Sequence, residues 1–213
     1  MAQCRITEIF YSLQGETRTV GLPTVFVRLT GCPLRCSYCD TAYAFHGGEK
    51  REISDIVAEV KAYNPRYITV TGGEPLAQTA CLELLTALCD LGAEVSIETS
   101  GALDISNIDK RVVTVMDLKT PASGEEPKNS YENISHLKRQ DQLKFVICDR
   151  ADYEWSRQKL TEYKIDSRCE VLFSPIHGQL KPADLADWIV EDNLPVRMQI
   201  QMHKYLWGDE EGR

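Results

Sequence analysis

The chain alternates between short apolar runs and longer stretches in which apolar residues recur every three or four positions. Short runs of this kind are typical of buried strands, and the longer stretches are typical of helices that cover them. Strands are expected at 5–12, 24–31, 66–75, 93–101, 111–121, 142–147, 170–176 and 196–206. The helical positions are Ile53, Ile56, Val57 and Val60, followed by Leu84, Leu85, Leu88 and Leu91. Two further helices are expected near 151–164 and 181–193.

Strands that alternate with helices imply a mostly parallel sheet with right-handed crossovers. With 213 residues, the chain is shorter than a complete eight-unit barrel of ~250 residues. We therefore expect an α/β fold, a shortened and partly open (β/α) barrel of about six mostly parallel strands. No repeat or long linker divides the chain, so residues 1–213 should form one domain, with an N-terminal strand segment and a C-terminal strand that caps the substrate site. Residues 122–130 should form an exposed loop, and a homodimer should cover the open side.

Composition and charge narrow the class of protein. The chain has 43% hydrophobic and 26% charged residues, typical of a soluble globular protein, and no apolar run approaches the ~20 residues of a membrane span. The first residues lack the pattern of a secretory signal, which predicts a cytoplasmic protein. A formal charge of −8 disfavours direct binding to nucleic acid, since basic faces normally supply that attraction. The eight cysteines are accordingly expected to be reduced thiols.

Polar motifs follow four of the expected strands. These motifs are CPLRCSYCD at 32–40, GGEP at 72–75, ETSG at 98–101 and DLKTP at 117–121. In parallel sheets, ligands gather at the carboxyl ends of the strands. The four motifs should therefore meet at one mouth.

Three cysteines, Cys32, Cys36 and Cys39, form the cluster C-x3-C-x2-C. Thiolates are soft ligands that suit an iron–sulfur cluster or zinc. A closed zinc site needs a fourth ligand, and neither a second CxxC nor an HxxxH is present, although His46 keeps a Cys3His site open. A four-iron cluster on three cysteines leaves one iron open, which is useful in an enzyme. The other five cysteines are expected to be small buried or surface residues with no metal role.

The cysteine spacing, with the aromatic Tyr38 just before the last cysteine, resembles the signature of the radical S-adenosylmethionine (radical SAM) superfamily. The resemblance implies a 4Fe–4S cluster on the three cysteines, whose open iron chelates S-adenosylmethionine and cleaves it to a 5′-deoxyadenosyl radical. It also implies that GGEP, through Gly73 and Glu74, accepts hydrogen bonds from the cofactor's amino group.

SLQGE at 12–16, VFVRLTGCPLRCSYCDT at 25–41 and QIQMHKYLWG at 199–208 are similar to motifs of the 7-carboxy-7-deazaguanine synthases, lyases of queuosine and 7-deazapurine biosynthesis. The resemblance spans nearly the whole chain. It implies conversion of 6-carboxy-5,6,7,8-tetrahydropterin to 7-carboxy-7-deazaguanine with loss of ammonia. It also implies a Mg²⁺ requirement and a reductant such as flavodoxin or ferredoxin.

The same resemblance implies roles for individual residues. The substrate would contact Leu13, Gln14, Gly15, Arg28 and Thr99. The cofactor would contact Tyr38, Asp40 and Gly101, with Lys119, Gln142 or Lys144 reaching the ribose, and Thr41 would bind Mg²⁺. Gln201 and His203 alternate in the last expected strand, which places them on one face where they would close the substrate site. Glu16 either faces the pterin or solvent.

Two other functions remain open at this point. A glycyl-radical activating enzyme shares a similar cysteine loop, but it acts on a protein and would not need Thr41 or SLQGE. A structural zinc module that binds a partner is the alternative outside enzymes.

Overall fold

Nine strands form one sheet in the order β3-β1-β2-β4-β5-β6-β7-β8-β9 in the computed structural model, which describes residues 2–212. The strands are β1 (Gln3–Leu13), β2 (Pro23–Leu29), β3 (Glu49–Glu52), β4 (Tyr67–Gly72), β5 (Glu94–Thr99), β6 (Val113–Asp117), β7 (Gln142–Ile147), β8 (Glu170–Pro175) and β9 (Arg197–Met198). Every pairing from β2 to β9 is parallel, whereas β1 pairs antiparallel with both β2 and β3. The expected mostly parallel sheet is confirmed. Its parallel part has seven strands, of which β9 has only two residues, and β1 and β3 add an antiparallel edge.

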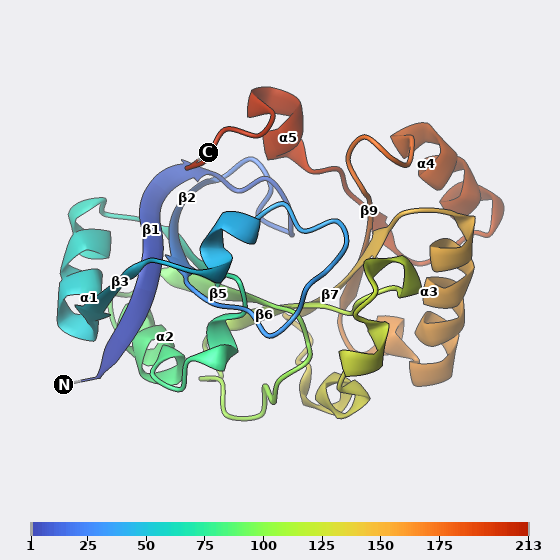
Figure 1. Cartoon of the computed structure of the whole chain (residues 1–213). Helices are drawn as coiled ribbons and strands as arrows, with labels where there is room; N and C mark the ends of the chain where they lie inside the picture. Colours follow the sequence, from blue (N-terminus) through green and yellow to red (C-terminus); the bar gives the residue numbers. More distant parts are fainter. Residues whose placement is uncertain (1, 213) are drawn as a thin grey trace.

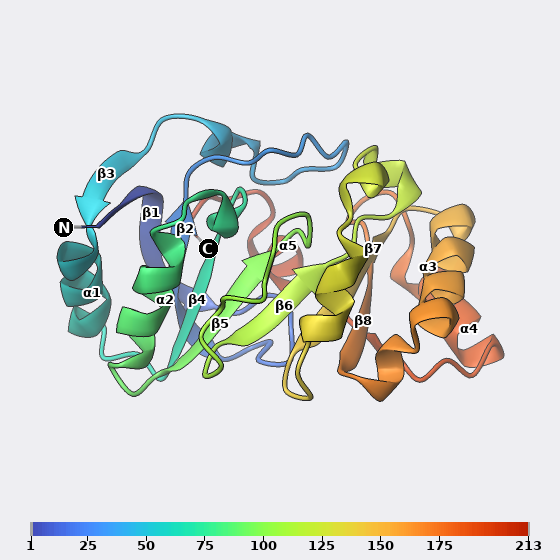
Figure 2. The same ribbon diagram turned by 90° about the horizontal axis from the view of Figure 1, so that it is seen from below.

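The sheet curls without closing, and the helices cover its outer side (Figure 1 and Figure 2). The helices are α1 (Ile53–Ala62), α2 (Cys81–Cys89), α3 (Arg150–Tyr163), α4 (Pro182–Glu191) and α5 (Met202–Trp207). The β5–β6 connection has no helix, and the β6–β7 connection has only short 3-10 turns. These two shortened units explain how the chain builds a partly open barrel. No helix within residues 2–212 is long and apolar enough to cross a membrane.

The two predicted apolar stripes bury against the outer face of the sheet. Ile56 and Val60 of α1 are fully buried, as are Leu84, Leu85 and Leu88 of α2, and all belong to one core with the strand residues. The five scattered cysteines, Cys4, Cys81, Cys89, Cys148 and Cys169, are all buried. Full burial of a leucine side chain stabilises the fold by roughly 1.5–3 kcal/mol.

The inner face of the sheet is polar, because alternate residues of each strand point to opposite sides. Thr69 and Thr71 of β4 point inward, while the alternating Ile68 and Val70 join the core under the helices. The inward positions of the next strands carry Ser96, Glu98, Asp117, Gln142 and Lys144. The barrel therefore encloses a polar space.

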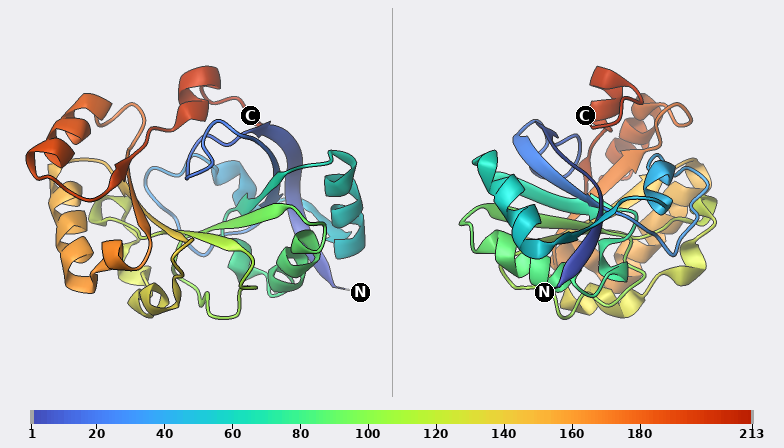
Figure 3. Two further views of the ribbon diagram at one scale, coloured as in Figure 1. Left: turned by 180° about the vertical axis from the view of Figure 1, so that it is seen from behind. Right: turned by 60° about the vertical axis from the view of Figure 1, so that its left-hand side comes forward.

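The C-terminal strand predicted at 196–206 is wrong beyond Met198, since β9 has two residues and α5 follows it. The Gln199 N–H donates to the Phe173 carbonyl at 3.0 Å. The next bond of this parallel ladder would need an N–H from Pro175, and proline has none. The chain therefore leaves the sheet, and α5 lies across the gap between β1 and β9 (Figures 1 and 3).

A close approach between Gly15 and α5 generates a prediction. The Met202 N–H donates to the Gly15 carbonyl at 3.0 Å, and a Cβ on Gly15 would run into the His203 ring. The backbone of Gly15 is not left-handed, so an alanine there adds no backbone strain. Gly15→Ala should therefore act through this collision alone and displace α5. Hydrogen exchange in 200–208 should then quicken about tenfold. Ser12→Ala is the control, and equal exchange in both variants would contradict the contact.

Candidate active site

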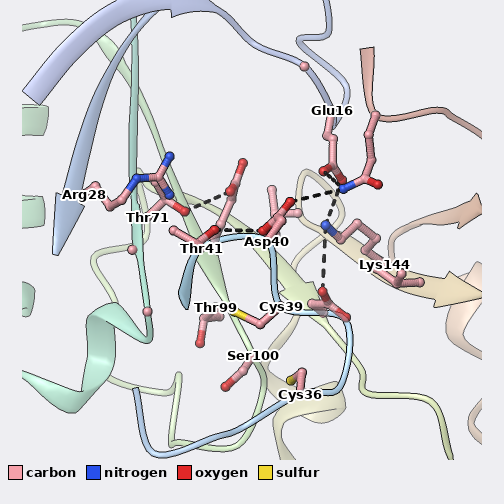
Figure 4. Close-up of a pocket in the computed structure, with 18 of the residues that line it drawn as sticks. Glu16, Arg28, Cys36, Cys39, Asp40, Thr41, Thr71, Thr99, Ser100 and Lys144 are labelled. Carbon is pink, nitrogen blue, oxygen red and sulfur yellow. Dashed lines mark hydrogen bonds and ion pairs between the residues drawn. The ribbon is translucent and has the colours of Figure 1, made fainter. Parts of the chain in front are cut away.

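One pocket opens on the inner face of the sheet at the carboxyl ends of the strands, where the four polar motifs meet (Figure 4). Most of the residues singled out from the sequence line it. These are Leu13, Gln14, Gly15, Arg28, Cys32, Cys36, Tyr38, Cys39, Asp40, Thr41, Gly73, Thr99, Lys119, Lys144, Gln201 and His203. Gln201 and His203 enter from the start of α5 rather than from a strand.

Three of the singled-out residues lie outside the pocket lining. Glu74 is fully buried and accepts hydrogen bonds from the Thr99 hydroxyl at 2.8 Å and the Ser100 N–H at 2.7 Å. Gly101 packs on Met116, and a Cβ there would lie 2.9 Å from Met116 Cγ. Gln142 lies deeper in the barrel, where its side-chain oxygen accepts the Arg18 N–H at 2.7 Å. The structure therefore places these three residues outside the pocket lining, and their predicted cofactor contacts stay predictions.

The cysteine loop follows β2 and packs directly on the GGEP turn. The Glu74 N–H donates to the Gly31 carbonyl at 2.8 Å, and a Cβ on Gly73 would run into the Gly31 backbone. Within the loop, the Leu34 N–H donates to Cys32 Sγ at 3.4 Å. Glycine at 73 thus allows two functional loops to touch.

The three thiols of the loop suit an iron–sulfur cluster. They are free, partly exposed and directed to the same pocket. Burial raises the pKa of Cys32 and raises that of Cys36 to about 11, so iron is the charge that would stabilise their thiolates. No three His, Cys, Asp or Glu side chains within 2–212 surround a single-ion position, and His46 is exposed outside the pocket. A cluster takes one thiolate per iron, so this arrangement fits a cluster better than a closed zinc site.

Residues 121–128, most of the segment predicted to be an exposed loop, instead brace the cysteine loop. They form two 3-10 turns, Pro121–Ser123 and Glu126–Lys128, and Glu125 between them is buried. Glu125 accepts the Arg35 N–H at 2.6 Å, and the Ser37 N–H donates to the Ser123 carbonyl at 2.9 Å. The prediction of an exposed loop over 122–130 holds for most of the segment and fails at Ser123 and Glu125, because polar composition alone does not reveal that a carboxylate will be paired with a backbone amide.

Buried charges on the right wall of Figure 4 pair with one another. Lys144 lies 2.8 Å from Glu16 and 3.8 Å from Asp117, which also pairs with Lys119 at 3.0 Å. Burial acts to lower the pKa of Lys144, but the neighbouring carboxylates raise it more, so the lysine stays cationic. Glu16 therefore faces the pocket, which the sequence had left open.

Two buried polar atoms of the lining have no hydrogen-bond partner within the described residues. They are the Tyr38 hydroxyl and Asp117 Oδ1. Buried polar groups in proteins are normally paired. These two atoms therefore fit a polar ligand such as S-adenosylmethionine. Asp117 begins the DLKTP motif that was expected at this mouth, but no role was predicted for it.

Glu98 is a second missed residue, and it lies at the back of the pocket. It accepts hydrogen bonds from Gln14 at 3.3 Å and from the Thr71 hydroxyl at 3.0 Å. Burial raises the pKa of the Glu98 carboxyl, Glu16 adds to the rise, and Lys144 opposes it. The period-two placement of Ser96 and Glu98 in β5 was the signal for an inward-facing polar row.

Comparisons with known proteins agree with this geometry. A model of the radical SAM superfamily matches residues 26–116. The chain is 42% identical to the 7-carboxy-7-deazaguanine synthase of Chlorobaculum tepidum, covering 98% of this chain and 96% of that protein. It is also 42% identical to that of Koribacter versatilis, covering 97% and 98%. The crystal structure of QueE from Escherichia coli superposes with a TM-score of 0.76 at 25% identity, covering 94% of this chain and 95% of that one.

The brace around the cysteine loop generates a prediction for the protein without its cluster. Glu125→Ala removes the acceptor of the Arg35 N–H, so the loop should open more often. Iodoacetamide should then alkylate Cys36 about tenfold faster, measured by mass spectrometry. Glu132→Ala, an exposed acid nearby, is the control. Equal alkylation rates in both variants would show that the brace does not hold the loop.

The raised pKa of Glu98 generates a pH-dependent prediction. Between its ordinary value of 4.5 and the raised native pKa, the native protein keeps a proton that the unfolded chain has lost, so stability falls as pH rises. Glu98→Gln cannot ionise, and its amide can still bond Gln14 and Thr71. Its Tm should exceed the wild-type Tm by a few degrees near neutral pH and converge below pH 4.5. Glu94→Gln, exposed on the same strand, should show no such trend.

Proposed function

Because the chain belongs to the 7-carboxy-7-deazaguanine synthase family of radical SAM enzymes, we propose that its pocket converts 6-carboxy-5,6,7,8-tetrahydropterin to 7-carboxy-7-deazaguanine with loss of ammonia. The chain is thus a lyase of 7-deazapurine biosynthesis that uses a 4Fe–4S cluster and S-adenosylmethionine. One observation carries the proposed substrate. The cysteine loop shares a pocket with an arginine on one wall and with amide and carboxyl groups on the others.

The residues around the cysteine loop would hold the cofactor. When bound, the cluster and S-adenosylmethionine would supply the radical chemistry for hydrogen-atom abstraction from the substrate. Cys32, Cys36 and Cys39 hold the cluster, and the backbone of Gly73 lies against the start of their loop. The unpartnered Tyr38 hydroxyl would donate a hydrogen bond to the nucleoside, and Asp117 Oδ1 would accept one from it, with Lys119 beside Asp117.

The opposite side of the pocket would hold the pterin. A pterin displays an amide-like edge with donors and acceptors, which the side chains of Gln14 and Glu16 can match. Its carboxylate suits the planar guanidinium of Arg28. Thr99 offers a hydroxyl oxygen, whose proton is directed to Glu74. Positions fixed in this way orient C6 of the substrate for hydrogen transfer.

Asp40 and Thr41 would hold Mg²⁺ next to the pterin carboxylate. Magnesium prefers oxygen ligands, and the Thr41 hydroxyl lies 2.8 Å from Asp40 Oδ1 at the pocket surface. The side-chain amide of Gln201 lies 3.4 Å from Asp40 and from Glu16, so α5 closes the pocket over these groups. This cover favours a small substrate over the protein substrate of a glycyl-radical activating enzyme.

The remaining expectations stay part of the proposal. They are a single domain, a cytoplasmic location, a reductant such as flavodoxin or ferredoxin, and no direct contact with nucleic acid. A homodimer is supported by two large side chains that a partner could cover. Tyr205 on α5 is 79% exposed, and Val190 on α4 is 77% exposed.

An anaerobic assay tests the reaction. Reconstituted protein with dithionite, S-adenosylmethionine, Mg²⁺ and 6-carboxy-5,6,7,8-tetrahydropterin should form 7-carboxy-7-deazaguanine, detected by mass spectrometry. Cys36→Ala should abolish the product, because one cluster ligand is lost, whereas Cys169→Ala, buried outside the loop, should retain it. Cofactor cleavage without a deazapurine would sink the proposed reaction.

A further inference from the structure

The pairing of β1 with β2 places Glu8 beside Arg28, just after a β-bulge in β1. The register of β1 against β2 pairs Ile6 with Leu29 and then Glu8 with Arg28, so one extra residue, Thr7, is inserted in β1. Residues directly opposite in an antiparallel pair point to the same side of the sheet. From Leu13 back to Glu8 the register with β2 is unbroken, so Glu8 lies opposite Arg28 independently of the bulge. The bulge changes the side taken by the residues before it, and Ile6 and Cys4 join the core on the outer face.

Glu8 holds the guanidinium of Arg28 at one edge. Arg28 Nε donates to Glu8 Oε1 at 2.7 Å, and the Tyr43 hydroxyl donates to the same oxygen at 2.8 Å. The side chains of Arg28 and Glu8 are only 15% and 22% exposed, so this pair is shielded from water far more than a surface ion pair.

Two aromatic rings fix the plane of the same guanidinium. Arg28 Cζ lies 5.6 Å from the centroid of the Phe10 ring and 5.8 Å from that of Tyr43. Phe10 is itself fixed by stacking on Phe26, with centroids 4.9 Å apart. These contacts leave the guanidinium little rotational freedom.

The free part of the guanidinium faces the pocket. Nε is the one nitrogen of Arg28 with a hydrogen-bond partner within 2–212, so both terminal NH₂ groups remain available. Figure 4 shows Arg28 directed toward the centre of the pocket, across from Lys144. Two parallel N–H donors in a fixed plane match a carboxylate.

We propose that Glu8 is a positioning residue that holds Arg28 as a fixed carboxylate receptor, with Tyr43 fixing Glu8 in turn. The proposal rests on the proposed function, because the carboxylate is that of the pterin. Glu8 has two opposing effects on ligand binding. It orients Arg28, which strengthens binding, and its own negative charge repels the ligand carboxylate, which weakens binding.

Two substitutions separate these effects. Glu8→Gln keeps an oxygen that can accept from Arg28 and Tyr43 but removes the charge, so binding should be equal or tighter. Glu8→Ala removes orientation as well as charge, so binding should weaken about tenfold. Glu49→Ala, an exposed acid on the adjacent β3, is the matched control and should bind as the wild type does.

The decisive measurement is equilibrium binding of pterin-6-carboxylate, with unsubstituted pterin as the ligand that lacks the carboxylate. Glu8→Ala should weaken the first and leave the second unchanged, whereas a general loss of structure would weaken both. In an Arg28→Ala background, Glu8→Ala should have no further effect, because its influence passes through Arg28. In the anaerobic assay, KM should rise in Glu8→Ala while kcat changes little.

The outcomes distinguish the positioning role from the reaction. Selective weakening for pterin-6-carboxylate supports the role of Glu8 even if the wild type forms no deazapurine. If Glu8→Ala tightens binding as much as Glu8→Gln does, Glu8 only competes for Arg28 and the proposal is overturned. Additive effects in the double variant would overturn it as well.

Discussion

One residue, Glu74, connects the loops on which the site depends. Its carboxylate accepts hydrogen bonds from the end of β5, and its N–H donates to Gly31 at the start of the cysteine loop. A fully buried carboxylate is tolerated only when its oxygens are paired, so the ends of β4 and β5 are held in one arrangement. The cluster ligands and the groups facing the substrate are thereby placed on one frame. The GGEP motif contributes its backbone to the pocket and its side chain to this frame.

The polar space inside the barrel imposes a second constraint, because each charge in it needs a partner of opposite sign. Lys144 is balanced by Glu16 and Asp117, and Arg28 on the other wall is balanced by Glu8. The carboxylates beside Lys144 therefore keep this lysine cationic without a ligand. A ligand carboxylate entering here meets donors that are already oriented, so little reorganisation is needed.

Much of this arrangement follows from the sequence. The periodic apolar residues located four helices and most strands, and the spacing of Cys32, Cys36 and Cys39 located the cluster loop. What the sequence could not supply was pairing between distant segments. The burial of Glu125 depends on the amide of Arg35, and the end of β9 depends on the missing N–H of Pro175 in another strand. Asp117 and Glu98 belong to the DLKTP and ETSG motifs expected at the mouth, but no role was predicted for either, because the charges that face them come from Lys119, Lys144 and Glu16 in other segments.

The contact between α5 and Gly15 has a thermodynamic consequence. Gln14, next to Gly15, and His203 on α5 line the same pocket from opposite segments. A ligand that touches both binds better when α5 is docked, so docking and binding are linked equilibria. The measured affinity is then the affinity of the docked state multiplied by the fraction of molecules in which α5 is already docked. Changes in the exposed C-terminal segment can thus alter affinity without any contact with the ligand.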